Sequence, residues 1–348
     1  MEKEKDIVII GGGPGGYTAA IRAAQLGAGV LLVEAEQLGG TCLNKGCIPT
    51  KALYKNAQLM HELSHAAEFG VRLEGVSIDI DEMMQRKQRI IDRLKEGIGQ
   101  LVKGNSIELI YGRASLAAKD KVKVIDSQGN KSPGELCADA VLVSVGREPN
   151  VEDLGLESLG IQYDRKGINV DAAYRTNVPG IYAIGDVIGG QMLAHVAAEE
   201  GVAAAEHIMG LKGQMNYGAV PGCVFTFPEI AAVGLSEEDA KEKGIDYAVS
   251  KFLFGANGKA LTMGEEEGFV KVLAETHTKR ILGVHIMGPH ASDLIHEAVL
   301  AVEKQMSSDD IGGLIHAHPT LSEALMEAAA GVGGKAVHML PKKNFACR

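Results

Sequence analysis

The sequence predicts an α/β chain of two domains. The first is a three-layer domain around a parallel sheet, and the second is a smaller α+β domain. Three observations support this: a glycine-rich turn between an apolar run and an Ala-rich segment, two cysteines five residues apart soon afterwards, and a change to short strand-like runs beyond about residue 213. We therefore expect domains at 1–212 and 213–348.

The opening residues predict a strand, a turn, a helix and a second strand. Residues 6–10 are apolar, residues 11–16 contain G-x-G-x-x-G, residues 17–26 read as a helix, and residues 30–33 read as a second strand that ends before Glu34. This order is typical of a Rossmann-like βαβ unit that binds a dinucleotide.

Each residue of this motif has a physical role in binding a dinucleotide. Gly11 permits the tight turn, Gly13 lets the backbone approach the pyrophosphate, and Gly16 allows close helix packing. Glu34 stands where a carboxylate accepts a hydrogen bond from a ribose hydroxyl. The motif alone does not separate FAD from NAD.

The two cysteines, Cys42 and Cys47, follow this unit directly. In a regular helix, positions five apart have Cα atoms about 8.7 Å apart, whereas a disulfide requires less than about 7 Å. The backbone between them must therefore be irregular. Gly46 tolerates unusual angles, and Pro49 disfavours the helical region at Ile48.

We interpret the pair as a redox-active disulfide facing a flavin, which favours FAD over NAD as the first nucleotide. Lys51 lies one turn beyond Cys47, where its charge stabilises a thiolate or a reduced flavin. A zinc site would need a second pair of ligands, but Cys137, Cys223 and Cys347 stand singly, so we expect no metal. A purely structural disulfide is the remaining alternative.

The rest of the chain reads as two sets of elements. In the first domain we expect helices at 50–63, 80–103 and 192–209, strands at 107–111, 121–125 and 140–145, and a polar turn at 126–135. In the second domain we expect antiparallel strands at 223–227, 247–254, 269–275 and 281–287, with helices at 236–243, 291–305 and 321–330.

Composition indicates a globular enzyme. The 348 residues are 46% hydrophobic and 23% charged, with a net charge of −10 that argues against nucleic-acid binding. No uninterrupted run of about 18 apolar residues is present, and no leader-like stretch follows the N-terminus, so we expect no membrane partner and a cytoplasmic location.

Four further motifs give the chain a family resemblance. They are Gly146–Asn150 (G-R-x-P-N), Thr176–Val187 with its A-I-G-D core, Leu193–His195, and His316–Glu323 (H-x-H-P-T-x-x-E). Together with the opening motif and the cysteines, the sequence resembles the flavoprotein disulfide reductases, and among them the dihydrolipoyl dehydrogenase family. The motifs cover both ends and most of the middle of the chain.

The resemblance implies an FAD site, a catalytic site and a homodimer. It assigns FAD contacts to Gly40, Thr41, Lys51, Gly112, Asp186, Leu193, Ala194 and His195, besides the opening motif. It makes His318, acting from the partner subunit, the base that deprotonates a dihydrolipoyl thiol, and Glu323 the residue that orients it. Its substrate would be free lipoamide or a lipoyl-bearing protein.

The chemistry of thiols gives an independent reason for this histidine. A dithiol reacts as thiolate, and a free thiol with a pKa near 8.5 is mostly protonated at neutral pH. A histidine takes that proton when a carboxylate fixes its tautomer. We also expect the apolar face of helix 291–305, formed by Leu294, Ile295, Ala298, Val299 and Val302, to serve the dimer.

The family's second glycine fingerprint, for NAD, is missing. Residues 97–99 lie in a helical pattern, and residues 331–334 have no strand before them. The two halves of the FAD domain are therefore expected to join directly near 126–140, where the NAD domain, on the order of 100 residues, would be inserted. We expect NAD to bind weakly or not at all.

Three functions follow as hypotheses. The favoured one is a dihydrolipoyl-dehydrogenase-like oxidoreductase that keeps the dithiol half-reaction and has lost NAD reduction. The second is an FAD-binding dimeric scaffold without turnover. The third is a related reductase of glutathione or mercuric ion, against which the Ile48–Lys51 run and the absence of a C-terminal cysteine pair argue.

Overall fold

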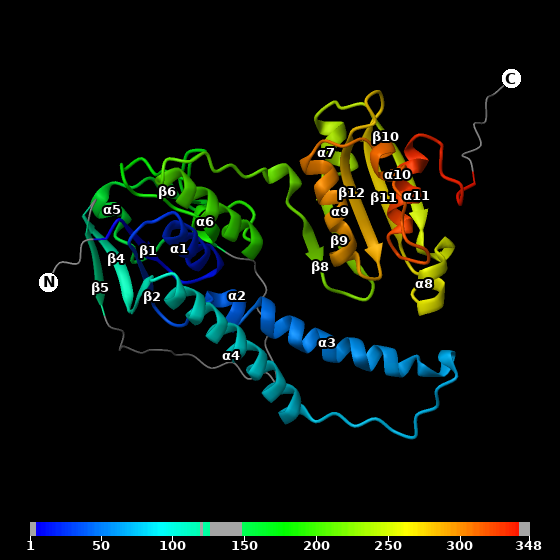
Figure 1. Cartoon of the computed structure of the whole chain (residues 1–348), viewed down its shortest axis with the longest axis horizontal. Coiled ribbons are helices and arrows are strands. Elements are labelled where there is room, and N and C mark those ends of the chain that lie inside the picture. The colour runs from blue at the N-terminus through cyan, green and yellow to red at the C-terminus, as the bar shows by residue number, and fades with distance from the viewer. Residues whose placement is uncertain (1–4, 119–120, 126–147, 341–348) are drawn as a thin grey trace. The chain divides into compact units, whose positions relative to one another are not determined.

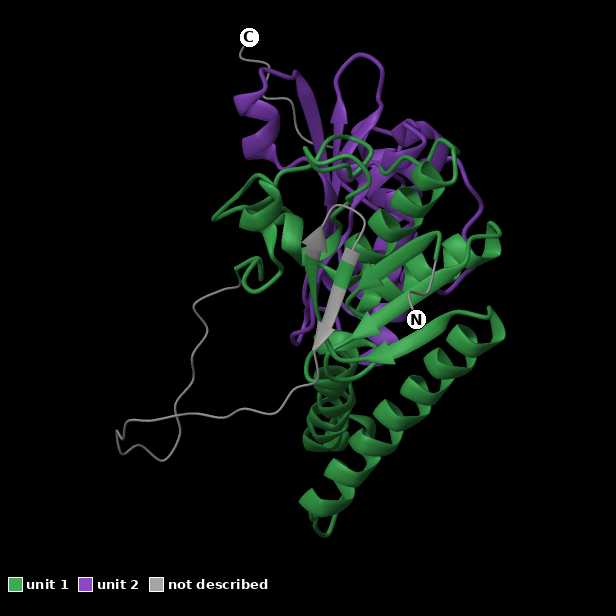
Figure 2. Ribbon diagram, turned by 90° about the vertical axis from the view of Figure 1, so that its left-hand side faces the viewer, with its two compact units in different colours: residues 1–215 green, residues 216–348 purple. Residues whose placement is uncertain are grey.

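A computed structural model describes residues 5–118, 121–125 and 148–340 (Figure 1). The chain divides into two compact units, which Figure 2 shows in different colours: unit 1 ends at Met215 and unit 2 begins at Asn216. The boundary expected from the sequence was residue 212. The strand expected at 140–145 and the junction at 126–140 lie outside the described residues, as do Gly146 and Arg147.

Unit 1 is built on a parallel sheet of three strands in the order β1-β2-β3. The strands are β1 (Ile7–Ile10), β2 (Val30–Glu34) and β3 (Glu108–Tyr111). Helix α1 (Pro14–Gln25) connects β1 to β2, so the predicted βαβ unit is confirmed. Its small residues Ala20 and Ala23 are fully buried in the core of the unit.

Helix α6 (Ala194–Ile208) packs directly against α1, and glycines set how close the two helices come. A Cβ at Gly201 would lie 2.5 Å from the Gly15 carbonyl oxygen, and a Cβ at Gly15 would lie 2.9 Å from the Ala197 carbonyl oxygen. Because no side chain fits at either contact, this crossing fixes α1 and the turn before it.

Three helices follow β2. They are α2 (Gly40–Asn44), α3 (Cys47–Ser64) and α4 (Ile80–Gly104), and α4 contacts both α2 and α3. The break between α2 and α3 falls between the two cysteines, as predicted. The predicted effect of Pro49 was wrong: Ile48 is helical, and Pro49 sits in the first turn of α3, where a missing N–H costs no hydrogen bond.

Strand β4 (Arg113–Ala118) was not predicted from the sequence. It pairs antiparallel with β5 (Lys121–Ile125) and contacts β2, so the hairpin adds a third layer to the parallel sheet and its helices. Across the undescribed segment the chain returns to this hairpin, because the Leu116 N–H donates to the Leu154 carbonyl at 2.8 Å. The remaining elements of unit 1 are η1 (Ala66–Phe69), α5 (Leu156–Leu159), β6 (Tyr163–Asp164), β7 (Gly167–Ile168) and η2 (Gly185–Ile188).

Unit 2 is an antiparallel sheet in the order β10-β11-β12-β9-β8. Its strands are β8 (Gly222–Val224), β9 (Glu229–Gly234), β10 (Tyr247–Leu253), β11 (Phe269–Glu275) and β12 (Ile281–Gly288). Its helical elements are η3 (Tyr217–Ala219), α7 (Glu237–Glu242), η4 (Phe254–Ala256), α8 (Gly258–Met263), α9 (Ala291–Glu303), α10 (Ser308–Gly312) and α11 (Glu323–Val332). The antiparallel α+β module is confirmed. Strand β9 and helices α8 and α10 were not predicted.

Helices α9 and α11 pack on this sheet, α9 against β9 and β12 and α11 against β10 and β11. Ile295 and Ala298 of α9 are buried in the core of unit 2, and Leu294, Val299 and Val302 pack against that core. The apolar face that we expected to serve the dimer is therefore packed against the antiparallel sheet of the same chain. This packing buries one face of that sheet.

A buried glutamate anchors the C-terminal end of the described chain. Glu327 of α11 is 3% exposed. Its Oε2 accepts from the Val337 and His338 N–H groups at 3.1 Å each, and its Oε1 is 2.8 Å from the His338 Nδ1. Met339 packs against the core of unit 2. These contacts hold residues 337–339 against α11.

Candidate functional site

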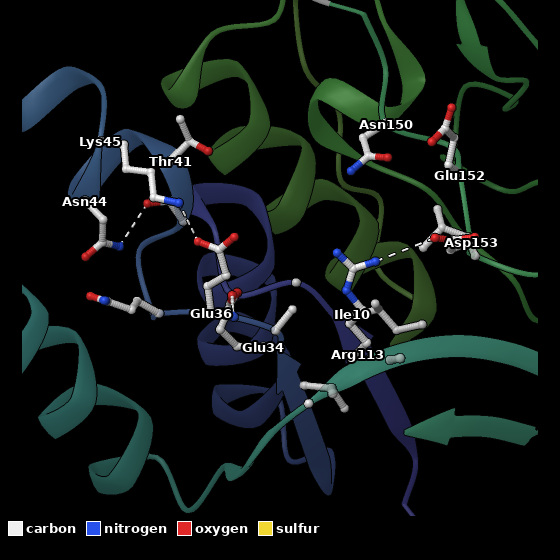
Figure 3. A pocket seen from close by; sticks show the side chains of 18 residues that line it. Ile10, Glu34, Glu36, Thr41, Asn44, Lys45, Arg113, Asn150, Glu152 and Asp153 are labelled. Atoms are coloured by element: carbon white, nitrogen blue, oxygen red, sulfur yellow. Dashed lines mark hydrogen bonds and ion pairs between the residues drawn. The ribbon is translucent and has the colours of Figure 1, made fainter. Parts of the chain in front are cut away.

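A pocket of about 580 Å³ opens where β1 and β2 end (Figure 3). This is where an open parallel sheet binds its ligand. Five of the residues predicted to bind FAD line it: Gly11, Glu34, Gly40, Thr41 and Gly112. The structure thus brings together residues that the sequence spreads over about 100 positions.

The glycine-rich turn has the geometry that the motif predicts. Gly11 has a φ of +98°, which other residues rarely adopt. A Cβ at Gly16 would lie 1.8 Å from the Gly11 carbonyl oxygen, whereas a Cβ at Gly13 would meet nothing within 4 Å. The turn is therefore closed behind Gly16 and open at Gly13, where α1 begins.

The N-terminus of α1 fits a phosphate group. Gly13 is the N-cap, and no side chain caps the helix. The first N–H groups of a helix attract anions. Gly40 lies close against this end, since a Cβ there would come within 2.8 Å of the Gly13 Cα. These features suit the pyrophosphate of a dinucleotide such as FAD.

Glu34 is held rigidly at the edge of the pocket. Its carboxylate accepts from the Gly12 N–H at 2.6 Å and from the Glu36 N–H at 2.7 Å, and the residue is 7% exposed. Two backbone bonds orient the side chain before any ligand arrives. Its predicted contact with a ribose hydroxyl stays a prediction.

Two ion pairs at the pocket were not predicted from the sequence. Lys45 and Glu36 lie 2.6 Å apart, and Arg113 and Asp153 lie 3.6 Å apart (Figure 3). The hydrogen bond from Lys45 lowers the pKa of the Glu36 carboxyl. In each pair the two residues come from different segments of the chain, so no local sequence motif indicates that they meet.

Both cysteines are free thiols in this structure, so the predicted disulfide is not formed here. Cys42 is half-buried in α2, and Cys47 is exposed at the start of α3. Burial raises the pKa of the Cys42 thiol to about 12, and a hydrogen bond that the Cys42 thiol donates to Cys47 adds to the effect. Lys51 acts in the opposite direction, so its charge does reach the pair.

The second predicted FAD motif lies on a turn anchored to α6. Asp186 belongs to η2, and Leu193 is the N-cap of α6, followed by Ala194 and His195. These four residues and Lys51 do not line the pocket. The Gly185 N–H donates to the Glu200 carboxylate at 2.7 Å, and Glu200 is 3% exposed. Sequence reasoning missed Glu200 because it lies inside a helical pattern.

In unit 2 the predicted histidine–glutamate contact is confirmed. The His318 Nδ1 is 2.9 Å from Glu323 Oε1, and Glu323 Oε2 accepts from the Thr320 N–H at 2.8 Å. The His318 side chain is 77% exposed, so its Nε2 faces solvent or a partner. The neighbouring His316 differs, because it is buried against Glu297 at 3.1 Å.

The environment of Glu323 predicts a pH dependence. Burial favours its protonated form, but the Thr320 N–H and His318 together hold its pKa below the ordinary value of 4.5. A carboxyl whose pKa is depressed on folding stabilises the protein above its unfolded pKa and loses that contribution as the pH falls through the folded value.

We expect Glu323→Gln to be less stable than the parent at pH 7 and to differ less from it below pH 4. Urea unfolding at a series of pH values measures this. The expectation fails if the difference between the two proteins is the same at every pH.

Among the described residues, no group of three or more His, Cys, Asp or Glu side chains is arranged to hold a metal ion. Of the helices in the described part of the chain, none is both long and apolar enough to cross a membrane.

Comparison with known proteins shows which family shares this arrangement. The pyridine nucleotide-disulphide oxidoreductase profile matches residues 5–124 and 116–201, and the dimerisation domain of the same family matches residues 220–329. A dihydrolipoyl dehydrogenase of Chlamydia muridarum is 33% identical over 465 aligned positions, covering 99% of this chain and all of the relative.

Two further comparisons agree. A dihydrolipoyl dehydrogenase of Geobacillus stearothermophilus is 34% identical, over 97% of this chain and 98% of the relative. The crystal structure of LpdA from Mycobacterium tuberculosis shares the fold with a TM-score of 0.83 at 21% identity, over 93% of this chain and 99% of that one. The chain therefore belongs to the pyridine nucleotide-disulphide oxidoreductase family.

Proposed function

We propose that the protein is an FAD-dependent oxidoreductase that exchanges its Cys42–Cys47 pair with the dithiol of a dihydrolipoyl group. The observation that carries this is the position of the thiols, directly after the segment that lines the nucleotide pocket with Gly40 and Thr41. The relatives, which are named dihydrolipoyl dehydrogenases, support the choice of dithiol.

FAD would be held by the glycine turn, Glu34, Gly40, Thr41 and Gly112 at the pocket, with Asp186, Lys51 and residues 193–195 contributing as the family resemblance implies. The chemistry that bound FAD supplies is acceptance of two electrons beside the cysteines. The protein's own contribution is to orient this group and to carry out the thiol exchange.

The exchange balances without any other reactant. His318 takes the proton of one substrate thiol, the thiolate attacks Cys42 of the Cys42–Cys47 disulfide, and Cys47 leaves as a thiolate. The second substrate thiol then displaces Cys42. The substrate ends as a cyclic disulfide, and the two cysteines end reduced.

We also propose that the NAD domain is missing. The alignment with the Chlamydia muridarum relative spans 465 positions and the chain has 348 residues, so at least 117 positions lack a counterpart. The family profile matches in two segments that overlap at 116–124, next to the β4–β5 hairpin. Within the described residues, the parallel strands are β1, β2 and β3 alone.

A missing NAD domain predicts a change of electron acceptor. Holding a nicotinamide against the flavin supplies much of the rate, because positioning is worth roughly 7–11 kcal/mol. We expect NAD reduction by dihydrolipoamide to be at least about 100-fold slower than reduction of a quinone or dye. Steady-state turnover with each acceptor measures the ratio. Saturable NAD reduction at a rate comparable with the dye would contradict it.

An anaerobic titration tests the dithiol function itself. Adding an excess of dihydrolipoamide, at least two equivalents per chain, to the FAD-loaded protein should bleach the flavin and release two additional reactive thiols per chain, identified as Cys42 and Cys47 by peptide mass spectrometry. A scaffold without turnover would keep its flavin spectrum. Glutathione and mercuric ion, offered separately, test the related reductases.

The assembly is proposed to be a homodimer located in the cytoplasm. The dimerisation domain at 220–329 supports the dimer, and it carries the His318–Glu323 pair. In the family arrangement that the resemblance implies, this pair would serve the cysteines of the partner subunit.

A further inference from the structure

The loop that carries His318 is tied to the core of unit 2 by one buried amide. The Asn257 Nδ2 donates to the Thr320 carbonyl oxygen at 3.0 Å, and Asn257 is 3% exposed. Its other side-chain atom, Oδ1, accepts from the Ala260 N–H at 2.9 Å and caps α8. Both ends of the amide are therefore used, and its orientation is fixed.

The backbone of Thr320 also orients the glutamate. The Thr320 N–H donates to Glu323 Oε2 at 2.8 Å, while Glu323 Oε1 lies 2.9 Å from the His318 Nδ1. Asn257 is therefore hydrogen-bonded to the carbonyl of Thr320, and the N–H of the same residue is hydrogen-bonded to Glu323, which contacts the imidazole. Each step is short enough to transmit a displacement of the loop.

We propose that Asn257 is a positioning residue for His318, acting through the backbone of Thr320 and through Glu323. This inference rests on the proposed function, in which His318 is the base. Asn257 itself lies 61 residues from His318 in the sequence and touches no reacting atom. Its effect on the reaction is to set where the ring sits and which nitrogen faces Glu323.

The rest of the loop does not replace this bond. The Thr320 Oγ1 donates to the Ala317 carbonyl at 2.6 Å and lies 2.9 Å from the Ser322 Oγ, so both contacts stay inside the loop. Leu321 is buried against the core but has no polar side-chain atom with which to orient the peptide. Among the side-chain hydrogen bonds that the structure describes for residues 317–323, the one from Asn257 alone comes from outside the loop.

Two substitutions separate the tie from the helix cap. Asn257→Asp has the same shape and still caps α8, but its carboxylate does not donate to the Thr320 carbonyl and repels it. Asn257→Ser also caps a helix well but is too short to reach Thr320. Ser236→Ala is the matched control, because it removes the cap of α7 in the same unit and leaves the loop untouched.

We expect both Asn257 variants to exchange dihydrolipoamide roughly 10-fold to 100-fold more slowly than the parent, with the Ser236→Ala rate unchanged. A displaced catalytic group lowers kcat, so KM should change less. The second readout does not depend on turnover. Carbon-13 NMR titration of the Glu323 carboxyl should show its pKa rising towards the ordinary value in both Asn257 variants, because the Thr320 N–H no longer points at it.

The two readouts distinguish the inference from the function on which it rests. If even the parent does not exchange dithiols, the proposed function fails, and the Glu323 titration still tests the tie. Parental rates and a parental Glu323 titration in both folded Asn257 variants would overturn the inference. So would an equal loss of rate in Ser236→Ala, which would assign the effect to general loss of stability.

Discussion

Replacing either Cys42 or Cys47 by serine is expected to lower dihydrolipoamide turnover by at least about 10³-fold, because loss of a covalent nucleophile is among the largest single effects in catalysis. A single remaining thiol does not form the intramolecular disulfide that the substrate attacks. Turnover with a dye acceptor measures the loss. Either variant retaining a tenth of the parental rate would show that the pair is not the redox centre.

The two variants should differ in the thiol that each retains. Cys47 is exposed, whereas Cys42 is half-buried and has a pKa raised to about 12 by burial and by Cys47. Thiolates are the reactive species. In the flavin-free protein, iodoacetamide should therefore label Cys47 in Cys42→Ser faster than it labels Cys42 in Cys47→Ser, as followed by peptide mass spectrometry. Cys223 in the same samples is the internal control.

Lys51, in α3, also affects the pKa of Cys42. Its charge lowers the pKa of Cys42 against the effects of burial and of Cys47. In Cys47→Ser the charge of the second thiolate is gone, so part of the upward shift of the Cys42 pKa is relieved, and burial of Cys42 remains. The labelling of Cys42 should thus be slow but measurable. If Cys47 were labelled more slowly than Cys42, the exposure assigned to the two thiols would be wrong.

The sequence predicted those parts of the site whose residues have one physical use. Gly11 and Gly16 were predictable because the turn requires a positive φ at Gly11 and leaves no room for a Cβ at Gly16. The His318–Glu323 contact is likewise short-range, across five residues. Such features depend on local geometry, which a motif records directly.

Long-range polar contacts were not predictable in the same way. Asp153 reaches Arg113, and Glu200 reaches the backbone of Gly185, only because distant segments pack together. Asn257 reads locally as a helix cap, and its bond to Thr320 spans 63 residues. A polar residue inside an ordinary pattern gives no sign of a remote partner.

The errors in the fold have similar causes. Strand β9 was missed because Ala231 and Ala232 lack the alternation that identifies a strand. Pro49 was given a helix-breaking role, although in the first turn of α3 its preceding residue is helical. The apolar face of α9 was assigned to a dimer because a sequence does not tell which surface an amphipathic helix covers.

His318→Ala is expected to slow thiol exchange by about 10²-fold to 10⁴-fold at pH 7, the usual effect of losing a general base. The deficit should shrink as the pH approaches 9, because the substrate thiol, with a pKa near 8.5, then ionises without help. His277→Ala is the matched control, since His277 also lies near a carboxylate in unit 2, at 3.8 Å from Asp246, but is far from the loop in sequence.

Mixing two inactive proteins tests whether His318 acts on the partner. Cys47→Ser retains its histidine and His318→Ala retains its cysteines, so a heterodimer would contain one complete site if the base comes from the opposite subunit. After subunit exchange, verified by mass spectrometry, we expect about a quarter of the parental activity, from statistical pairing of half-active heterodimers. No recovery would mean that His318 serves the cysteines of its own chain, because a site formed within one subunit is defective in every combination.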